Sequence, residues 1–411
     1  MYQLAQEAII KIINDGGYVN IVISDFIKNS ELTDHERRLF TRIVYGTVEK
    51  YLLLDYYLKP YTSGKKIKTP IRNILRMGVY MIFFMNIANH FVVNELVKMV
   101  KRQDFRASGL VNAVLRSIIR DGLREIEKKD LVSYLSIKYS YPIELVKELY
   151  NQYPNDIENI LRADGEIYNT YRINTLKTTI DEIKDYLENK EYKYKIDGTT
   201  LWSKESLIKT PLFMEGKIIS QDSSSQRVAL ITNPVKNSRI LDSCSAPGGK
   251  ACHMATMMEN MGEIICLDIY PHKLKLIEEN AKNQGITILK TCLSDAREYY
   301  DDKPFDYVVI DAPCSGLGVM DHKVDLKYHM SVSSMKELVT LQSQILDHLS
   351  ALVVKNGYLV YSTCTINKNE NTYQIKKFIE KHPEYQLLEE IQLLPSNEGD
   401  GFYICKLQRK A

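Results

Sequence analysis

The chain has 411 residues, of which 45% are hydrophobic and 26% charged. This composition is ordinary for a globular protein, and the length is too great for a single hydrophobic core. No apolar run approaches the roughly 18 residues of a membrane span, and the N-terminus lacks the basic region of a secretory signal, so we expect neither membrane insertion nor secretion. The seven cysteines form no CxxC pair, which argues against a disulfide scaffold or a zinc ribbon and favours a cytoplasmic location.

The net charge of +2 is unevenly distributed. Residues 1–125 carry 19 Lys and Arg against 12 Asp and Glu, whereas the rest of the chain carries 35 against 40. A basic N-terminal part on a near-neutral body indicates an electrostatic contact with nucleic acid. A solvated helical surface is the alternative explanation of the same charge.

Residues 1–126 are predicted to form an all-α domain, because apolar residues recur there at helical spacing. Thr33 followed by Glu36 forms a capping box that predicts a helix start. A later helix through NAVLRSIIR is expected to end near Asp121-Gly122.

Residues 127–215 are predicted to form a helical linker followed by a small α/β module. The linker is helical over residues 127–162, with a break at Tyr141-Pro142. From residue 171 to about 219 the pattern changes to short strands around one helix, and both YRINTLK and LFMEGKIIS fit strands.

Residues 216–411 alternate between strands and helices, which predicts a Rossmann-like α/β domain with a mostly parallel sheet covered on both faces. The strand candidates are RILD (239–242), EIICLD (263–268), a short strand near residues 288–289, YVVID (307–311), GYLVYS (357–362) and FYICKL (402–407).

Ligands of open α/β sheets bind beyond the carboxyl ends of the strands, so the residues after each strand are the candidate site. The Gly248-Gly249 pair follows the first strand, where missing Cβ atoms allow a close approach to the backbone. The second strand ends at Asp268, a position suited to a ribose diol, and Asp295 follows the next strand, where a carboxylate can accept from an adenine amino group. Each aspartate could instead cap a helix or form a surface turn, but together they favour a nucleoside ligand without a pyrophosphate.

Two further strands end beside cysteines: Asp311 and Cys314 follow one strand, and Cys364 follows the other. A thiolate that adds to C6 of a pyrimidine makes C5 nucleophilic, while an acid near N3 stabilises the adduct. Two buried strand-end cysteines are the structural alternative, and chemistry alone does not choose between them as nucleophile. Four other cysteines, not including Cys244, are interpreted as small buried residues: Cys252, Cys266, Cys292 and Cys405.

Taken together, these motifs strongly resemble the cytosine-C5 RNA methyltransferases of the NOL1/NOP2/Sun type. The segments that carry the likeness are CSAPGGK (244–250), Asp268, Asp295, DAPCSGLG (311–318) and STCT (362–365). The N-terminal half is similar to the NusB-like domain of the bacterial 16S rRNA enzymes of the RsmB/Sun (Fmu) type, through RRLFTRIVYGTVEKYLLLDYYL (37–58), VNELVKMVKR (93–102) and GLVNAVLR (109–116). The ending EGDGFYICKL (398–407) is similar to their final hairpin.

The resemblance implies a fold and a set of roles: a class I methyltransferase domain preceded by the NusB-like domain and an RNA-recognition-like module. The implied substrate is 16S rRNA, unassembled or early in assembly, acted on by a monomer without a metal. Cys364 would be the nucleophile, Cys314 would assist product release, Lys250 would lie near the base, and Asp311 would face both cytosine and cofactor. The cofactor, S-adenosyl-L-methionine, would be held by Cys244, Ser245, Ala246, Pro247, Gly248, Gly249, Lys250, Asp268, Asp295 and Asp311.

The sequence departs from the family at two places. Ser243 and Ser245 replace the usual Leu and Ala, and we expect altered affinity for the cofactor without loss of binding. After residue 319 the usual basic run is replaced by MDHKV, which includes Asp321 and weakens the local attraction for RNA. The same chemistry on tRNA or large-subunit rRNA remains an alternative, as does an inactive RNA-binding assembly factor, although the intact Asp311, Cys314 and Cys364 argue against the latter.

Overall fold

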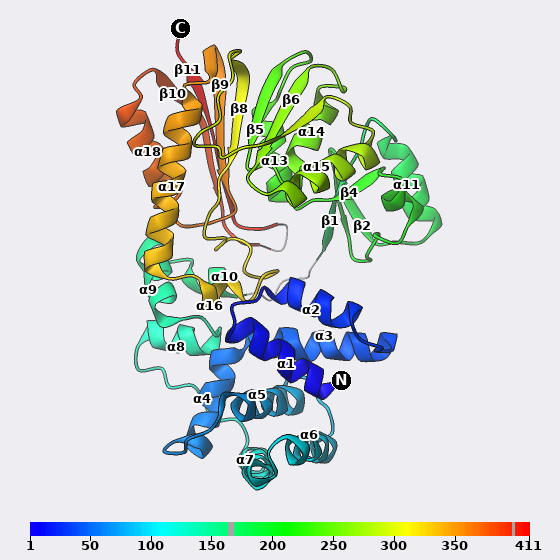
Figure 1. Ribbon diagram of the computed structural model, residues 1–411, viewed down its shortest axis with the longest axis vertical. Coiled ribbons are helices and arrows are strands. Elements are labelled where there is room, and N and C mark those ends of the chain that lie inside the picture. The colour runs from blue at the N-terminus through cyan, green and yellow to red at the C-terminus, as the bar shows by residue number, and fades with distance from the viewer. Residues whose placement is uncertain (163–167, 397–398) are drawn as a thin grey trace. The chain divides into compact units, whose positions relative to one another are not determined.

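The computed structural model describes residues 1–162, 168–396 and 399–411, and the chain divides into two compact units (Figure 1). The first unit comprises Met1–Ala163 together with Met320–Val332, and the second comprises Asp164–Val319 together with Ser333–Ala411. No helix in the described part of the chain is long and apolar enough to cross a membrane.

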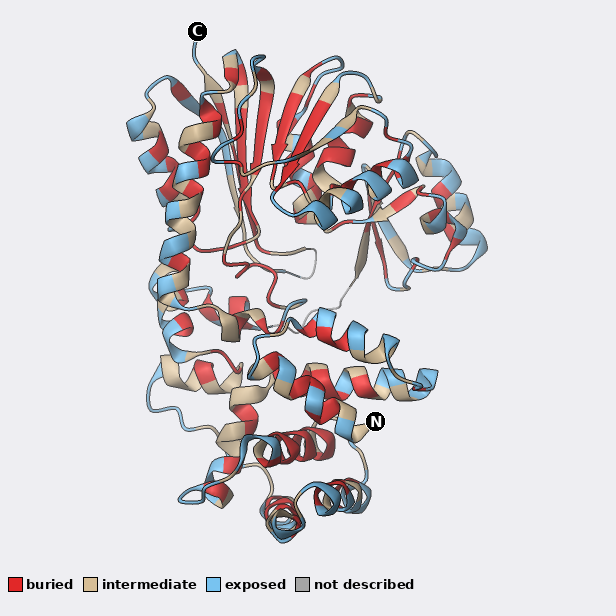
Figure 2. Ribbon diagram, in the orientation of Figure 1, coloured by how far each residue is buried: buried red, intermediate tan, exposed pale blue. Residues whose placement is uncertain are grey.

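The first unit is all-α. Thr33 and Glu36 form the predicted capping box of α3, and Gly122 ends α7 with a positive φ of 74°. Helix α5 is buried almost all round at the centre of this unit (Figure 2). Its helices are α1 (Tyr2–Ile13), α2 (Val19–Lys28), α3 (Asp34–Glu49), α4 (Tyr51–Thr62), α5 (Thr69–Phe83), α6 (Asn89–Gln103), α7 (Phe105–Asp121), α8 (Leu131–Lys138), α9 (Ile143–Gln152), α10 (Ile157–Leu161) and α16 (Leu326–His329).

The segment Met320–Val332 belongs to the helical unit although it follows the DAPCSGLG motif in the chain. Val324 joins the apolar core of that unit. The Lys327 ammonium is buried and donates to the carbonyl of Glu49 at 2.9 Å, and burial lowers its pKa to about 7. The Tyr45 hydroxyl donates to the carbonyl of Asp321 at 2.8 Å. The departure from the family's basic run therefore lies in a segment whose backbone and buried lysine are tied to helices of the N-terminal unit.

A small four-stranded antiparallel sheet opens the second unit, in the order β2-β3-β1-β4. The expected strand over LFMEGKIIS is wrong for its first half: Pro211 starts a helical turn, and Gly216, with a φ of 68°, ends it before a three-residue strand. The hairpin formed by β2 and β3 was not predicted. The elements are β1 (Asn169–Ile173), α11 (Ile180–Asn189), β2 (Tyr194–Asp197), β3 (Thr200–Ser203), α12 (Pro211–Met214) and β4 (Ile218–Ser220).

The buried guanidinium of Arg172, on β1, attaches the small sheet to the segment before α13 and to the end of α15. Its Nε donates to Gln221 at 2.9 Å and its Nη2 donates to Gln284 at 2.6 Å. Burial lowers the pKa of Arg172 to about 10, which shows how completely the group is removed from water.

The larger sheet has seven strands in the order β10-β11-β9-β8-β5-β6-β7. Strands β9, β8, β5, β6 and β7 run parallel, and β10 and β11 add an antiparallel hairpin at one edge. The strands are β5 (Arg239–Ser243), β6 (Glu263–Asp268), β7 (Leu289–Leu293), β8 (Phe305–Asp311), β9 (Val353–Thr363), β10 (Tyr385–Leu393) and β11 (Phe402–Arg409).

Helices cover both faces of this sheet, as the alternating pattern predicted (Figure 1). Helices α17 (Val332–Ser350) and α18 (Thr372–Lys381) bury one face, and α13 (Ser223–Thr232), α14 (Gly249–Met257) and α15 (Pro271–Gln284) bury the other. The second unit is a Rossmann-like α/β domain with a small α/β module before it. The carboxyl ends of the parallel strands therefore carry the residues that follow β5, β6, β8 and β9.

Candidate functional site

The turn after β5 brings backbone to the carboxyl edge of the sheet. Cys244 adopts a φ of 57°, and Gly248 has a φ of 93° as the N-cap of α14. A Cβ at Gly248 would lie 3.1 Å from Ile277 Cγ2 in a conformation that side chains rarely adopt, so glycine is needed here. Residues 244–250, including Ser245, Ala246, Pro247 and Gly249, form a tight strand-to-helix turn in which Pro247 is exposed and Ser245 is buried.

Asp242 is a site residue that the sequence reasoning missed. It is buried at the end of β5, and burial raises its pKa to about 7. Ser245, one of the departures from the family pattern, donates from its hydroxyl to Asp242 Oδ2 at 2.6 Å. Within the described residues, Asp242 Oδ1 and the Ser243 hydroxyl have no hydrogen-bond partner. The position of Asp242 directly before the glycine-rich turn was the signal that could have identified it.

The two other predicted carboxylates lie at the last residue of β6 and just beyond β7. Asp268 is 6% exposed, and its Oδ1 accepts from the backbone N–H of Tyr270 at 3.0 Å. Asp295 forms a local pair with Arg297, whose Nη2 donates at 2.6 Å, and this hydrogen bond holds the pKa of Asp295 below its usual range. Both aspartates therefore make local turn contacts, which is the alternative that the sequence left open for each of them. The two side chains are not hydrogen-bonded to each other.

Lys250, Asp311 and Ser362 form a connected group. Lys250 Nζ donates to Asp311 Oδ2 at 2.6 Å, and the Ser362 hydroxyl donates to Asp311 Oδ1 at 2.9 Å. Burial disfavours the charged form of Lys250, but the adjacent Asp311 carboxylate outweighs it and raises the lysine pKa. An ammonium–carboxylate pair is therefore held at the ends of β8 and β9, where the sequence placed Asp311.

The structure brings the two strand-end cysteines together, with Cys314 Sγ and Cys364 Sγ 3.3 Å apart. The Gly318 N–H donates to the carbonyl of Cys364 at 3.1 Å, which fixes the loop after β8 against the loop after β9. A Cβ at Gly318 would lie 1.9 Å from the carbonyl oxygen of Gly401, so no larger residue fits at this approach.

The two thiols have different surroundings. The hydrogen bond with Cys364, together with burial and the negative charges of Cys364 and Glu370, holds the pKa of Cys314 well above its usual range. Cys364 is close enough to Lys250 for its charge to raise the lysine pKa. A neighbouring ammonium favours a thiolate, which is the nucleophilic form of cysteine.

The other cysteines largely match the buried interpretation. Cys252, Cys266 and Cys405 are fully buried, whereas Cys292 is only half-buried against one face of the sheet. Burial, with the nearby carboxylates of Asp311, Asp242 and Asp268, raises the pKa of Cys244 to about 12. Over the ranges that the structure describes, no three His, Cys, Asp or Glu side chains are grouped to hold a metal ion.

The site fits a charged nucleoside ligand. Asp242, with one free oxygen, the unpaired Ser243 hydroxyl, the turn at Gly248-Gly249 and the carboxylate of Asp268 provide acceptors for amino and hydroxyl groups at one edge of the described sheet. The thiol pair and the Lys250–Asp311 pair lie at the ends of the adjacent strands β8 and β9.

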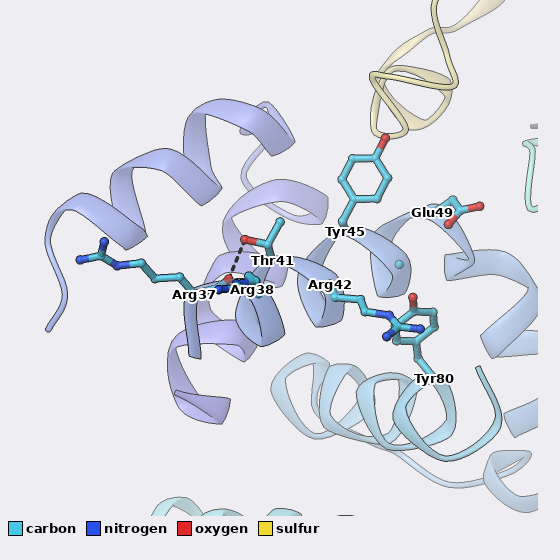
Figure 3. A pocket seen from close by; sticks show the side chains of 8 residues that line it. Arg37, Arg38, Thr41, Arg42, Tyr45, Glu49 and Tyr80 are labelled. Carbon is cyan, nitrogen blue, oxygen red and sulfur yellow. Dashed lines mark hydrogen bonds between the residues drawn. The ribbon is translucent and has the colours of Figure 1, made fainter. Parts of the chain in front are cut away.

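The helical unit has a basic pocket of about 430 Å³ on α3 (Figure 3). Arg37, Arg38 and Arg42 line it, with Arg42 lying along the ring of Tyr80 in Figure 3. Tyr45, which holds the segment after residue 319, also lines the pocket. Part of the positive charge predicted for the N-terminal domain is thus gathered around one hollow.

Known protein families match both the N-terminal and the C-terminal part of the chain. Residues 229–408 match the family described as 16S rRNA methyltransferase RsmB/F, and residues 2–120 match the NusB family. The chain is 34% identical to the probable ribosomal RNA small subunit methyltransferase B of Bacillus subtilis, covering 99% of this chain and 98% of that protein. It is 28% identical to the ribosomal RNA small subunit methyltransferase B of Vibrio vulnificus, covering 99% of each.

Solved structures share the fold. The crystal structure of PH0851 superposes with a TM-score of 0.81 at 24% identity and covers 98% of both chains. A methyltransferase homologue from Pyrococcus horikoshii covers 67% of this chain and 97% of its own, with a TM-score of 0.60 at 22% identity. With its NusB domain, its methyltransferase fold and relatives that match its full length, the chain belongs to the RsmB/F family of 16S rRNA methyltransferases, and its cofactor is S-adenosyl-L-methionine.

Proposed function

We propose that this protein transfers a methyl group from S-adenosyl-L-methionine to C5 of a cytidine in 16S rRNA through a covalent bond between Cys364 and C6. The observation that carries the proposal is the thiol pair of Cys314 and Cys364, 3.3 Å apart, next to the Lys250–Asp311 ion pair. Methyl transfer to oxygen or to an exocyclic nitrogen needs no thiol, whereas C5 of a pyrimidine requires nucleophilic activation.

The cofactor supplies an electrophilic methyl group. Residues 244–250, with Asp268, Asp295 and Asp311, would surround it; Asp268 would accept from the ribose hydroxyls, and Asp242 adds a buried acceptor. Asp295 is the weakest of these assignments, because both of its oxygens already accept from Arg297.

Cys364, activated by the Lys250 ammonium, would add to C6 and form a C6–S bond. The Lys250–Asp311 pair would deliver a proton to N3. This proton neutralises the negative charge that develops on the ring when the thiolate adds, and C5 becomes enamine-like. C5 would then take the methyl group as the bond between that group and the sulfonium sulfur breaks, leaving S-adenosylhomocysteine. Loss of the C5 proton to water, assisted by Cys314, and return of the N3 proton to the Lys250–Asp311 pair would restore the C5–C6 double bond as the C6–S bond breaks and the Cys364 thiolate leaves.

We propose three functional parts: residues 1–126 as a NusB-like RNA-binding domain, 127–215 as linker and RNA-recognition-like module, and 216–411 as the methyltransferase domain. Arg37, Arg38 and Arg42 would contact RNA phosphates. The target cytosine must be unpaired or splayed out for a cysteine to reach C6, which favours rRNA that is free or early in assembly. A cytoplasmic monomer is sufficient for this scheme.

Bisulfite mapping of 16S rRNA from cells with and without the gene tests the proposal. One cytosine that loses its protection in the deletion strain, and regains it with the wild-type gene but not with Cys364→Ala, is the expected result. Loss of a methylation mark in tRNA or 23S rRNA alone would identify that RNA, and not 16S rRNA, as the substrate. Unchanged marks in all three RNAs would favour an assembly factor without methyltransferase activity.

A further inference from the structure

Glu370 is a buried carboxylate that the scheme above does not use. It is 0% exposed and follows β9 in the loop that carries Cys364. Across the described part of the chain, no lysine or arginine forms a salt bridge with it. A buried negative charge is tolerated only where hydrogen-bond donors replace water, so its partners indicate what it is for.

Four donors satisfy the Glu370 carboxylate. The backbone N–H of Ser315 donates at 2.9 Å and the Ser315 hydroxyl also donates. Gln342 Nε2 and Asn367 Nδ2 each donate at 2.9 Å. Each oxygen of the Glu370 carboxyl group accepts two of these hydrogen bonds.

These partners come from three separate segments. Ser315 is the neighbour of Cys314, Gln342 lies on α17, and Asn367 lies three residues beyond Cys364. Gln342 also donates to the carbonyl of Pro313 at 2.9 Å. Glu370 therefore ties both sides of Cys314 to the loop of Cys364.

The charge of Glu370 acts on the thiol of Cys314. It adds to the hydrogen bond, the burial and the charge of Cys364 in raising the pKa of Cys314. Cys364, Glu370 and the buried phenol of Tyr361 are titratable groups close enough to interact with Cys314. The ammonium of Lys250 is close enough to interact with Cys364.

We propose that Glu370 is a positioning residue that fixes the loops of Cys314 and Cys364 together and, through its buried charge, reserves Cys364 for attack on C6. The consequence for the reaction is that Cys314 is a thiol while the sulfur of Cys364 attacks C6. The inference rests on the proposed function for its meaning, but the first of its two measurements, the reactivity of Cys314, uses neither RNA nor cofactor.

The first measurement is the pH dependence of Cys314 alkylation by iodoacetamide in full-length Cys364→Ala protein, read by peptide mass spectrometry. Adding Glu370→Gln removes the charge while keeping the size. A nearby negative charge raises the pKa of a thiol by about one. Without that charge, Cys314 is expected to react roughly tenfold faster at a fixed pH below its pKa. Glu380→Gln, an exposed position on the adjoining helix α18, is the matched control and should leave the profile unchanged.

The second measurement separates position from charge. Glu370→Asp keeps the charge but shortens the reach to Ser315, so the Cys314 profile should stay while methyl transfer slows in kcat with little change in KM for RNA. An unshifted profile in a folded Glu370→Gln protein, or full-rate transfer by Glu370→Asp, would overturn the proposal. Should the glutamine variant fail to fold, the aspartate variant still decides the positioning role.

The two failures can be told apart. If wild-type protein methylates no cytosine but Glu370→Gln shifts the alkylation profile, the proposed function fails and the effect of the buried charge stands. If C5 methylation is found and neither Glu370 variant differs from wild type, only this inference fails.

Discussion

The sulfur atoms of Cys314 and Cys364 lie 3.3 Å apart, although 50 residues separate them in the chain. Strands β8 and β9 are neighbours that run parallel, so the loops that follow them meet at one edge of the sheet. Two thiols at this separation can act on the same carbon–carbon bond of a base, one on each step of an addition and elimination.

The two cysteines are expected to give opposite mutant behaviour. Cys364→Ala should abolish methyl transfer and adduct formation, because no thiolate remains to attack C6, while cofactor binding persists. Cys314→Ala should transfer the methyl group but stall at elimination, and accumulate as a covalent complex with RNA. A denaturing gel of both variants with radiolabelled 16S rRNA measures the adduct.

The same gel distinguishes the alternatives. If the roles are reversed, Cys364→Ala is trapped and Cys314→Ala is inert. If both cysteines are only structural, both variants remain active and neither is trapped.

Asp268→Ala should weaken binding of S-adenosylmethionine by roughly 1–3 kcal/mol, the scale of hydrogen bonds to a charged group. Isothermal calorimetry measures the change, and thermal unfolding without cofactor checks the loss of the Tyr270 contact. Asp268→Asn, which retains an acceptor for that N–H, is the control for the turn. Unchanged affinity in folded Asp268→Ala would remove this residue from the cofactor site.

The arginines of the α3 pocket should contribute to RNA affinity. Deleting the N-terminal domain is not a clean test, because Val324 and Lys327 pack into it. Replacing Arg37, Arg38 and Arg42 together by Ala should weaken RNA binding and flatten its dependence on salt, since fewer counterions are released.

A matched variant removes the same charge elsewhere in the unit: Lys59, Lys65 and Lys66, all exposed, replaced by Ala. Fluorescence anisotropy at several salt concentrations compares the two. Equal salt slopes for wild type and the arginine variant would assign the pocket to another role.

Asp242 should make stability depend on pH. Its pKa is raised to about 7 in the folded protein, chiefly by burial, so the folded state holds a proton that the unfolded state releases from about pH 4 upward. The contribution of this group to stability is therefore greatest at low pH and falls as the pH rises towards 7.

Asp242→Asn keeps an acceptor for the Ser245 hydroxyl and cannot ionise. The difference in unfolding free energy between this variant and wild type should increase from pH 5 to pH 8 by roughly 1–3 kcal/mol, in favour of the variant, because the raised pKa of Asp242 destabilises only the wild type over this range. Chemical denaturation at the two pH values measures the difference. A constant difference between the proteins would mean that Asp242 ionises normally.

Local sequence determined the type and limits of many elements. The capping box at Thr33 and Glu36 and the stop at Gly122 were predicted and are present, because caps satisfy backbone groups within a few residues. Strand β6 was predicted with its observed bounds, since a strand buried on both faces reads as a continuous apolar run. The strand expected over LFMEGKIIS failed where Pro211 and Gly216 impose a turn.

Sequence order also placed Asp268, Asp311, Cys314 and Cys364 after successive strands, hence at one edge of the sheet. Their mutual contacts were decided only by the tertiary structure: the thiol pair, the bond of Ser245 to Asp242, the burial of Glu370 and the membership of residues 320–332 in the helical unit. A local sequence pattern reflects which side chains of a segment are exposed to water and which hydrogen bonds its own backbone can form. Contacts between segments depend on which strands are neighbours and on how the loops beyond them fold, and those distances are set by the packing of the whole domain.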